Sequence, residues 1–450
     1  MLEPLYTAAE MRAAEERYPG YPESVPELME RAGAAVAREA MRTFPDAHRF
    51  AAVCGKGNNG GDGRVAVRVL REAGRDASEA TDLDGAEVVV DALFGTGFRG
   101  EPRPDAAELI RRMNEAGAPV VSVDVPSGLD ASSGEISGAA VEAALTVTFH
   151  GSKVGLAVAP GRFCAGDVVV ADIGLEPGET EHGLVTPEIL RLVRPRRPRD
   201  TKYTAGSVLV VGGAPGLTGA ACLAAEAAFR ADAGYVAVAA PRESLPVIEQ
   251  RLLEAVKRPL DEVFAAAERA SALAIGPGLG RTEERKQLVR RLLAEVDLPA
   301  VVDADGLFEL EPFERSAPTV LTPHEGELAR LLGLESGWVA AHRLEALRRA
   351  VERFRCAVLL KGADTLVGAP GEGVLVTALA PTGALAAAGT GDVLTGIVGA
   401  LLAKGLEARL AAAAGAAAQQ LASTLADQQR GLVAGDVVSA LPAALERFGR

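Results

Sequence analysis

Carboxylate, amide and hydroxyl side chains directly follow three apolar runs in the first half of the chain. They occur in the segments Asn58-Asn-Gly-Gly-Asp-Gly63, Asp91-Ala-Leu-Phe-Gly-Thr-Gly97 and Asp124-Val-Pro-Ser-Gly128. Oxygens of these types are hard ligands that suit an alkali or alkaline-earth ion, so Asn59, Asp91 and Ser127 could form a cation site. Asp124 could act beside it as a general base.

The first of these segments overlaps a G-x-G-x-x-G pattern from Gly55 to Gly60, which is typical of a dinucleotide-binding turn. Asn58, Asn59 and Asp62 stand where such a turn normally has small or apolar residues, and a lone match is weak. We therefore do not interpret it as a redox-cofactor turn. The alternative for all three segments is structural, since glycines make tight turns and aspartates cap helices.

In the second half, Gly389-Thr-Gly-Asp392 opens an apolar helix. Successive N–H groups at a helix N-terminus bind anions, and an aspartate there could deprotonate a hydroxyl that attacks a phosphoryl group. Three further segments each follow an apolar run and could contact a nucleotide or substrate: Gly276–Gly280, Thr322–Glu327 with His324, and Leu360–Thr365. No glycine loop ends in Gly-Lys-Ser/Thr, which excludes a P-loop.

Alternating strands and helices must position these segments. The predicted helices of the first half are 7–17, 25–41, 64–72 and 106–116, and the predicted strands of the chain are 50–54, 87–93, 119–125, 145–149, 167–173, 207–211, 235–239, 272–275, 300–303, 319–321, 357–360 and 374–376. Continuous apolar strands between helices indicate an α/β fold with parallel sheets covered on both faces. Ligands bind such sheets at the carboxyl ends of the strands, where the polar segments lie.

Composition limits the class of protein. The 450 residues suggest two domains, and the Pro- and Arg-rich stretch 195–204 is a predicted linker. The net charge of −14 argues against a nucleic-acid partner. Four dispersed cysteines match no zinc spacing, and neither a signal peptide nor an apolar run of about 18 residues is present. We expect a cytoplasmic protein without a membrane partner.

The motifs taken together resemble a known family. The segments 58–63, 91–97 and 124–128 resemble those of NAD(P)H-hydrate epimerases, the YjeF N-terminal domain. Gly-Pro-Gly-Leu-Gly280, Thr-Pro-His-Glu-Gly-Glu327, Leu-Lys-Gly-Ala-Asp-Thr365 and Gly-Thr-Gly-Asp392 are similar to those of ADP-dependent NAD(P)H-hydrate dehydratases. The resemblance implies a Rossmann-like three-layer αβα domain at 1–194 and a ribokinase-like αβα domain at 205–450. Asp232 departs from the family pattern, which usually has glycine there.

For the first domain, the resemblance implies interconversion of the R and S hydrates of NADH and NADPH (NADHX and NADPHX). Asp124 would be catalytic, and K⁺ would be bound by Asn59, Asp91 and Ser127. The implied hydrate contacts are Asn58, Asn59, Gly60, Gly61, Asp62, Gly95, Thr96, Gly97, Phe98, Arg99, Gly100, Glu101 and Asp124.

For the second domain, the resemblance implies dehydration of the S hydrate at the expense of ADP, giving AMP and phosphate. Asp392 would activate the C6 hydroxyl, and Mg²⁺ would bridge the ADP phosphates. The implied hydrate contacts are Ala220, Gly278, His324 and Asp392, and the implied nucleotide contacts are Lys361, Gly362, Ala363, Asp364, Thr365 and Gly391.

Two alternatives remain at this stage. A kinase of a small hydroxylated metabolite would account for Gly389–Asp392 but leave the first half without a role. A non-catalytic binding module would account for the first half, but it would be expected to lack Asn59, Asp91 and Asp124, which are all present. We also expect a homo-oligomer.

Overall fold

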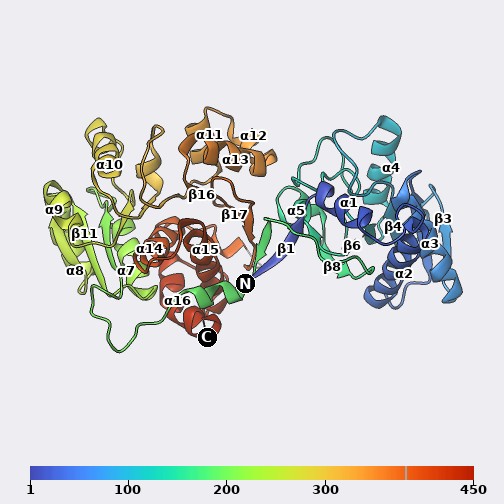
Figure 1. The fold of residues 1–450 in the computed structure, drawn as a ribbon, viewed down its shortest axis with the longest axis horizontal. Helices are drawn as coiled ribbons and strands as arrows, with labels where there is room; N and C mark the ends of the chain where they lie inside the picture. Colours follow the sequence, from blue (N-terminus) through green and yellow to red (C-terminus); the bar gives the residue numbers. More distant parts are fainter. Residues whose placement is uncertain (381–382, 450) are drawn as a thin grey trace. The chain divides into compact units, whose positions relative to one another are not determined.

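The computed structural model describes residues 1–380 and 383–449, and these form two compact units (Figure 1). The N-terminal unit comprises Pro4–Gly183 with Ala340–Leu344, and the C-terminal unit comprises Met1–Glu3, Leu184–Val339 and Glu345–Arg450. The first part of the chain folds as β1 (Leu2–Tyr6), α1 (Ala8–Glu16), α2 (Val25–Thr43), β2 (Arg49–Cys54), α3 (Asn58–Glu72), β3 (Asp76–Glu79), β4 (Val88–Ala92), α4 (Pro104–Glu115), β5 (Val120–Val123), β6 (Leu145–Phe149), β7 (Ser152–Lys153), α5 (Val154–Ala157), α6 (Gly161–Cys164) and β8 (Asp167–Ala171).

A six-stranded parallel sheet forms the centre of the N-terminal unit, in the order β3-β2-β4-β5-β6-β8. Alternate residues of its strands face opposite sides, as strand geometry requires. Ala52 and Val90 pack with α2 and α3, whereas Ala51 and Val89 pack with α4. The predicted three-layer αβα architecture is therefore confirmed.

Helix α3 begins six residues earlier than predicted, at Asn58 rather than at Arg64. The sequence 58–63 is glycine-rich, and glycine in a helix costs about 1 kcal/mol relative to alanine. Helix propensity therefore predicts a loop over these residues. Close packing overrides this propensity. A Cβ on Gly60 would lie 1.9 Å from the Gly55 carbonyl oxygen, and one on Gly63 would lie 2.4 Å from Ala92 Cβ. The polar residues therefore sit on the first turns of a helix.

The C-terminal part of the chain repeats the alternation. Its elements are β9 (Gly183–Val185), η1 (Pro187–Leu192), β10 (Ser207–Val211), α7 (Thr218–Arg230), β11 (Tyr235–Ala240), η2 (Arg242–Ser244), α8 (Leu245–Arg251), β12 (Val256–Pro259), η3 (Leu260–Glu262), α9 (Val263–Ala267), β13 (Ala272–Ile275), α10 (Glu283–Glu295), β14 (Ala300–Val302), η4 (Ala304–Leu307), β15 (Thr319–Leu321), α11 (Glu325–Leu332), α12 (Ser336–Ala341), α13 (Arg343–Phe354), β16 (Ala357–Leu360), β17 (Thr365–Gly368), β18 (Leu375–Thr377), η5 (Gly383–Leu385), α14 (Thr390–Ala403), α15 (Ala408–Leu425) and α16 (Ala434–Phe448).

The sheet of the C-terminal unit runs in the order β12-β11-β10-β13-β14-β15-β16-β17-β18. Its strands are parallel as far as β16, but β16, β17 and β18 pair antiparallel. The strands β12 and β17 were not predicted. Within the described residues, no helix is both long enough and apolar enough to span a membrane.

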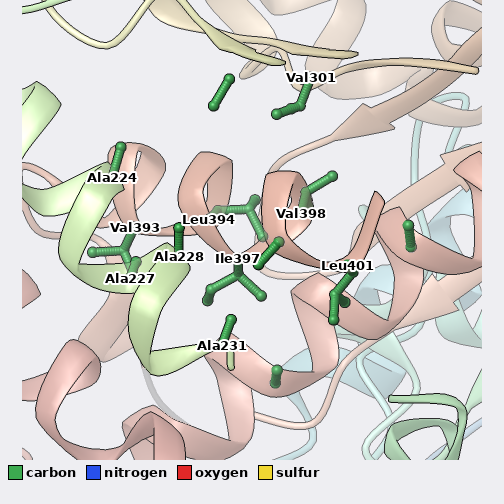
Figure 2. Close-up of a cluster of buried hydrophobic side chains, with 14 of the residues drawn as sticks. Ala224, Ala227, Ala228, Ala231, Val301, Val393, Leu394, Ile397, Val398 and Leu401 are labelled. Carbon is green, nitrogen blue, oxygen red and sulfur yellow. The ribbon is translucent and has the colours of Figure 1, made fainter. Parts of the chain in front are cut away.

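Small side chains allow α7 and α14 to pack closely (Figure 2). Ala224, Ala227, Ala228 and Ala231 of α7 face Val393, Leu394 and Ile397 of α14 in one buried cluster. Gly396 brings the backbones into contact, because a Cβ there would lie 2.0 Å from the Ala224 carbonyl oxygen. The alanine-rich composition therefore serves close packing of helices.

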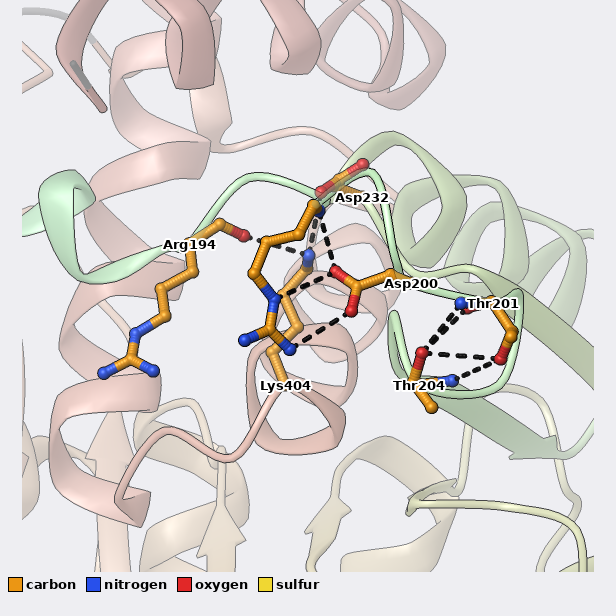
Figure 3. Close-up of polar contacts among 7 residues, drawn as sticks. Arg194, Asp200, Thr201, Thr204, Asp232 and Lys404 are labelled. Atoms are coloured by element: carbon orange, nitrogen blue, oxygen red, sulfur yellow. Dashed lines mark hydrogen bonds and ion pairs between the residues drawn. The ribbon is translucent and has the colours of Figure 1, made fainter.

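The arginine-rich connector is held by ion pairs and turns (Figure 3). Asp232 has φ 70°, the left-handed region that favours glycine. Its carboxylate pairs with Lys404 at 2.8 Å, as Figure 3 shows, and also with Arg196 at 2.7 Å. Thr201 and Thr204 exchange backbone-to-hydroxyl hydrogen bonds. Aspartate tolerates this backbone conformation better than most residues. The glycine that the family pattern usually has at this position could not form the two ion pairs.

The division between units falls at Gly183/Leu184, whereas the sequence suggested a boundary at 194 and a linker at 195–204. Val185, Ile189, Leu190 and Val193 are buried in the core that α15 and α16 also form. By its packing, the segment 184–194 therefore belongs with the C-terminal unit.

Gly396→Ala should destabilise the C-terminal unit by about 3 kcal/mol, because a side chain there forces two helix backbones apart. Gly399→Ala in the same helix is the matched control. Its Cβ would lie 3.4 Å from Ala274 Cβ and Val208 Cγ1, an ordinary contact, so a change below about 1 kcal/mol is expected. Urea unfolding followed by circular dichroism measures both, and equal midpoints for the two variants would contradict the packing argument.

Candidate active sites

The N-terminal site lies where the strand order changes direction. From β2, the chain adds β3 on one side and β4 on the other, and the carboxyl ends of β2 and β4 lead into α3 and into the segment from Leu93. In open parallel sheets, ligands bind at such switch points. The structure thus brings Asn58–Asp62, Asp91 and Asp124 to one edge of the sheet.

Asp91, at the end of β4, is fully buried. Its carboxylate accepts hydrogen bonds from Ser127 Oγ (2.6 Å), Ser127 N (2.8 Å), Ser122 Oγ (2.9 Å) and Leu93 N (3.3 Å). All four donors are neutral, and no lysine or arginine within residues 1–380 and 383–449 pairs with it. A buried carboxylate with no cation beside it is an environment that a bound monovalent cation would neutralise.

Asn59 and Ser127 meet at the backbone of Phe94, three residues after Asp91. Asn59 Nδ2 donates to the Phe94 carbonyl (2.9 Å), and Phe94 N–H donates to Ser127 Oγ (2.8 Å). In the described part of the chain, Asn59 Oδ1 accepts no hydrogen bond. The three predicted cation ligands are therefore close together, and their oxygen donors fit K⁺.

Asp124 forms a buried ion pair that the sequence did not indicate. Its backbone has φ 67°, and its Oδ1 lies 2.7 Å from Lys153 Nζ. Lys153 has no exposed surface, and its ammonium also donates to Thr148 Oγ1 and the Phe149 carbonyl, each at 2.8 Å. Thr148 in turn donates to Asp124 Oδ1 at 3.1 Å. This network fixes the orientation of the Asp124 carboxylate.

The Gly95–Glu101 loop borders this site. A Cβ on Gly95 would lie 3.0 Å from Asn59 Oδ1, so this glycine packs directly on the Asn59 amide. Phe98 stacks on Phe94 with ring centroids 4.7 Å apart. Arg99 is largely exposed and lies 3.6 Å from Asp130. The loop thus places exposed backbone and the Arg99 guanidinium beside Asn59 at this edge of the sheet.

The C-terminal site lies at the corresponding change of strand order, between β10 and β13. Gly213 N–H donates to the Pro277 carbonyl and Ala214 N–H donates to the Gly278 carbonyl, which joins the loops after the two strands. A Cβ on Gly278 would lie 3.2 Å from Ala220 Cβ. The two predicted hydrate contacts Ala220 and Gly278 are therefore neighbours.

A lysine and carboxylates also organise the C-terminal site. Lys361, after β16, donates to Asp303 Oδ1 at 2.7 Å and lies 3.7 Å from Glu327 Oε2. Asp303 is almost fully buried, and its other oxygen accepts from Thr395 Oγ1 at 2.7 Å. Burial acts to lower the pKa of Lys361, but Asp303 and Glu327 outweigh it and the pKa is raised. The ammonium is therefore charged at this sheet edge.

The first turn of α14 lies directly over this ion pair. A Cβ on Gly391 would lie 3.4 Å from Lys361 Nζ and 3.5 Å from Asp303 Oδ2. Asp392, the next residue, has its pKa raised to about 7 by burial and by the nearby Asp303 carboxylate. A carboxyl group that titrates near neutral pH is suited to accept a proton from substrate.

The other predicted residues of this site divide into two groups. His324 is the N-cap of α11: Gly326 N–H donates to its Nδ1 (3.0 Å), and its Nε2 lies 3.5 Å from Glu327 Oε1. The ring remains half exposed at the site. Asp364 and Thr365 are buried, with Gln420 of α15 donating to Thr365 Oγ1 at 3.4 Å. Gly362 and Ala363 are exposed between Lys361 and this buried pair.

Lys153, Asp303 and Thr395 were missed as site residues. Lys153 directly precedes the apolar run 154–160, and Asp303 stands at the end of a predicted strand, much as Asp91 does. Both features were visible in the sequence. Their roles were not, because each depends on a partner more than 25 residues away in the chain.

Comparisons with known proteins identify the family of each half of the chain. Residues 208–443 match the family model described as NAD(P)H-hydrate dehydratase, and residues 25–78 and 71–155 match YjeF-related protein N-terminus. A bifunctional NAD(P)H-hydrate repair enzyme from Moorella thermoacetica is 38% identical, covering 99% of this chain and 97% of the relative. The Escherichia coli enzyme of the same name is 34% identical over 92% and 88%.

The chain belongs to the family of bifunctional NAD(P)H-hydrate repair enzymes. A solved structure similar to the C-terminal unit is the ADP/ATP-dependent NAD(P)H-hydrate dehydratase of Bacillus subtilis, co-crystallised with ATP/Mg²⁺. It is 28% identical with a TM-score of 0.54 and covers 58% of this chain and 97% of that chain. The predicted ribokinase-like fold of the repair enzyme's second half is confirmed.

Asp124→Ala should destabilise this repair enzyme by about 3 to 5 kcal/mol, because it leaves the Lys153 ammonium buried without its carboxylate. Asp124→Asn keeps an oxygen acceptor and tolerates a positive φ, so a smaller loss is expected. The midpoints of denaturant unfolding compare the two variants. Equal losses would show that the charge of Asp124, rather than its acceptor oxygen, offsets the Lys153 ammonium, and an unchanged midpoint for Asp124→Ala would exclude a stabilising role of the ion pair.

Proposed function

We propose that this protein restores hydrated NADH and NADPH in two steps on one chain. Residues 1–194 interconvert the R and S hydrates, and residues 205–450 dehydrate the S hydrate with ADP, giving AMP and phosphate. The observation that carries the proposal is a lysine-paired aspartate at the ligand edge of each sheet: Asp124 with Lys153, and Asp303 with Lys361 beside Asp392. The near full-length similarity to repair enzymes supports both activities.

In the first site, the hydrate would contact Asn58–Asp62, the Gly95–Glu101 loop and Asp124. Asp124, oriented by Lys153 and Thr148, acts as a general base at C6, the ring carbon that carries the hydroxyl group. Asn59, Asp91 and Ser127 would hold K⁺, which supplies positive charge beside the buried Asp91 carboxylate. The uncompensated charge of Asp91 supports this assignment.

In the second site, the C6 hydroxyl of the S hydrate attacks the terminal phosphoryl group of ADP while Asp392 accepts the hydroxyl proton. Lys361 and the N–H groups at Gly391 face the negative charge that develops. Phosphate then leaves with the C6–O electron pair, the N1 lone pair assists, and loss of a C5 proton restores the dihydronicotinamide. When bound with the nucleotide, Mg²⁺ would supply positive charge to its phosphates, as the ATP/Mg²⁺ co-crystals of the relative suggest.

Ala220, Gly278 and His324 would contact the hydrate, and Lys361–Thr365 with Gly391 would contact the nucleotide. The burial of Asp364 and Thr365 favours a positioning role for these two residues within that stretch. We also propose a homo-oligomer located in the cytoplasm, where NADH and NADPH are used.

Asp392→Asn should abolish ADP-dependent dehydration while epimerisation continues, and Asp124→Asn should do the reverse. Each change removes one proton acceptor and keeps the side-chain shape. The assay treats acid-generated NADH hydrates with the full chain, ADP and Mg²⁺, and follows dihydronicotinamide absorbance together with the epimer ratio. Failure of the unmodified protein to recover NADH with either ADP or ATP would overturn the proposed function, and loss of both activities in either variant would indicate misfolding.

K⁺ should raise the unfolding midpoint of the N-terminal unit relative to tetramethylammonium at equal ionic strength, since a ligand of the folded state stabilises it. Asn59→Ala should remove most of this difference because it deletes a ligand oxygen. Lys361→Ala, in the other unit, is the control that should leave it unchanged. Identical midpoints in the two salts would exclude the K⁺ site without testing the epimerase activity.

A further inference from the structure

Asp62 stands apart from the other carboxylates of the N-terminal site. It lies on α3, three residues after Asn59 and therefore on the same helix face. Its side chain is partly buried, and within residues 1–380 and 383–449 it has no hydrogen-bond donor and no cationic partner. Asp91 has four donors and Asp124 has Lys153. Asp62 therefore faces the ligand edge with its carboxyl group uncommitted.

The charged groups that face Asp62 are negative. The carboxylates whose charges act on it are Asp124, in the segment after β5, and Glu15, in α1. Lys153 is the nearby cation, and it is already paired with Asp124. Burial first, and then Asp124 and Glu15, raise the pKa of Asp62 from 3.8 to about 8. At neutral pH, a carboxylic acid and a lysine-paired carboxylate therefore stand at one site, which is the pattern of an acid–base pair.

We propose that Asp62 is the proton donor of the epimerase site and forms an acid–base pair with Asp124, the two exchanging roles between the R and S hydrates. The inference rests on the proposed epimerase function and assigns to Asp62 a step beyond hydrate contact.

The step balances as follows. The Asp62 proton passes to the C6 hydroxyl oxygen, the C6–O bond breaks with its electron pair leaving in water, and the N1 lone pair forms an N1=C6 iminium. Water on the opposite face of the ring forms the new C6–O bond and gives a proton to Asp124. The other epimer results, with Asp62 ionised and Asp124 protonated. This protonation state is the starting state for the reverse reaction. Proton exchange with solvent returns the proton to Asp62 before another forward reaction.

The acid–base assignment accounts for why Asp124 is paired with a lysine and Asp62 is not. A proton donor must hold its proton at working pH, and burial together with the Asp124 and Glu15 charges raises the pKa of Asp62 in that direction. A proton acceptor must be correctly oriented, which Lys153 and Thr148 ensure for Asp124. Glu15 touches neither reacting group and acts as a positioning residue through its charge.

Asp62→Asn should lower kcat for epimerisation by at least about 100-fold with little change in KM, since general acid catalysis contributes that much. The substrate is the purified R hydrate of NADH, treated with the full chain without ADP, and the epimer ratio is followed by chromatography. In the unmodified protein, kcat should fall as the pH rises through about 8. Glu15→Gln removes a negative charge, so this fall should move to lower pH while kcat at pH 6 is retained.

Folding of the variant can be checked independently. The folded state binds the Asp62 proton more tightly than the unfolded chain, so stability is lost as pH rises from 3.8 through about 8. Asn has no proton to lose, so Asp62→Asn should unfold at the same or a higher temperature than the unmodified protein at pH 8.

The outcomes separate the two proposals. If the unmodified protein does not epimerise the hydrate, the proposed function fails. If it does, but Asp62→Asn keeps its kcat or Glu15→Gln leaves the pH profile unchanged, the assignment of Asp62 is wrong and the proposed function stands.

Discussion

Removing an ammonium group from water costs several kcal/mol, and this cost governs both sites. Lys153 has no exposed surface and Lys361 is about four-fifths buried, with 21% of its side chain exposed. Each is tolerated because a carboxylate lies 2.7 Å away and further oxygens accept its remaining hydrogens or add negative charge. The buried lysines require Asp124 and Asp303 as partners at the carboxyl ends of their strands. One carboxylate charge in each site is therefore already compensated.

Within residues 1–380 and 383–449, a second carboxyl group in each site forms no ion pair with a lysine or arginine. Asp62 and Asp392 both lie in the first two turns of a glycine-containing helix, and both have raised pKa values, about 8 and about 7. Burial is the largest cause for both, and the neighbouring lysine-paired aspartate is next. The lysine thus determines two protonation states. It forms an ion pair with one carboxylate, and the charge of that carboxylate raises the pKa of the other.

The sequence predicted the alternation of strands and helices, the two-part organisation and the polar segments at the strand ends, because these depend on local periodicity and residue type. It placed the start of α3 at Arg64 because glycine propensity argues against a helix at Asn58, and only the packing of Gly60 against Gly55 reverses that preference. Lys153 and Asp303 were not predicted as site residues for a related reason. An isolated polar residue in an apolar stretch acquires a role only from a partner that folding brings close, and no local pattern names that partner.

Packing and chemistry meet in α14. Its N-terminus lies over Lys361 and Asp303, where a Cβ on Gly391 would be in ordinary contact with both. Its body can approach α7 only because Gly396 has no side chain and the alanines of α7 have small ones. Any enlargement along the α7–α14 contact would displace the helix axis from the sheet. Asp392 would then move away from Asp303 and toward solvent, and both changes would lower its pKa. The alanine- and glycine-rich core is therefore part of what sets the pKa of Asp392, the proposed proton acceptor, although none of its residues is a proposed substrate contact.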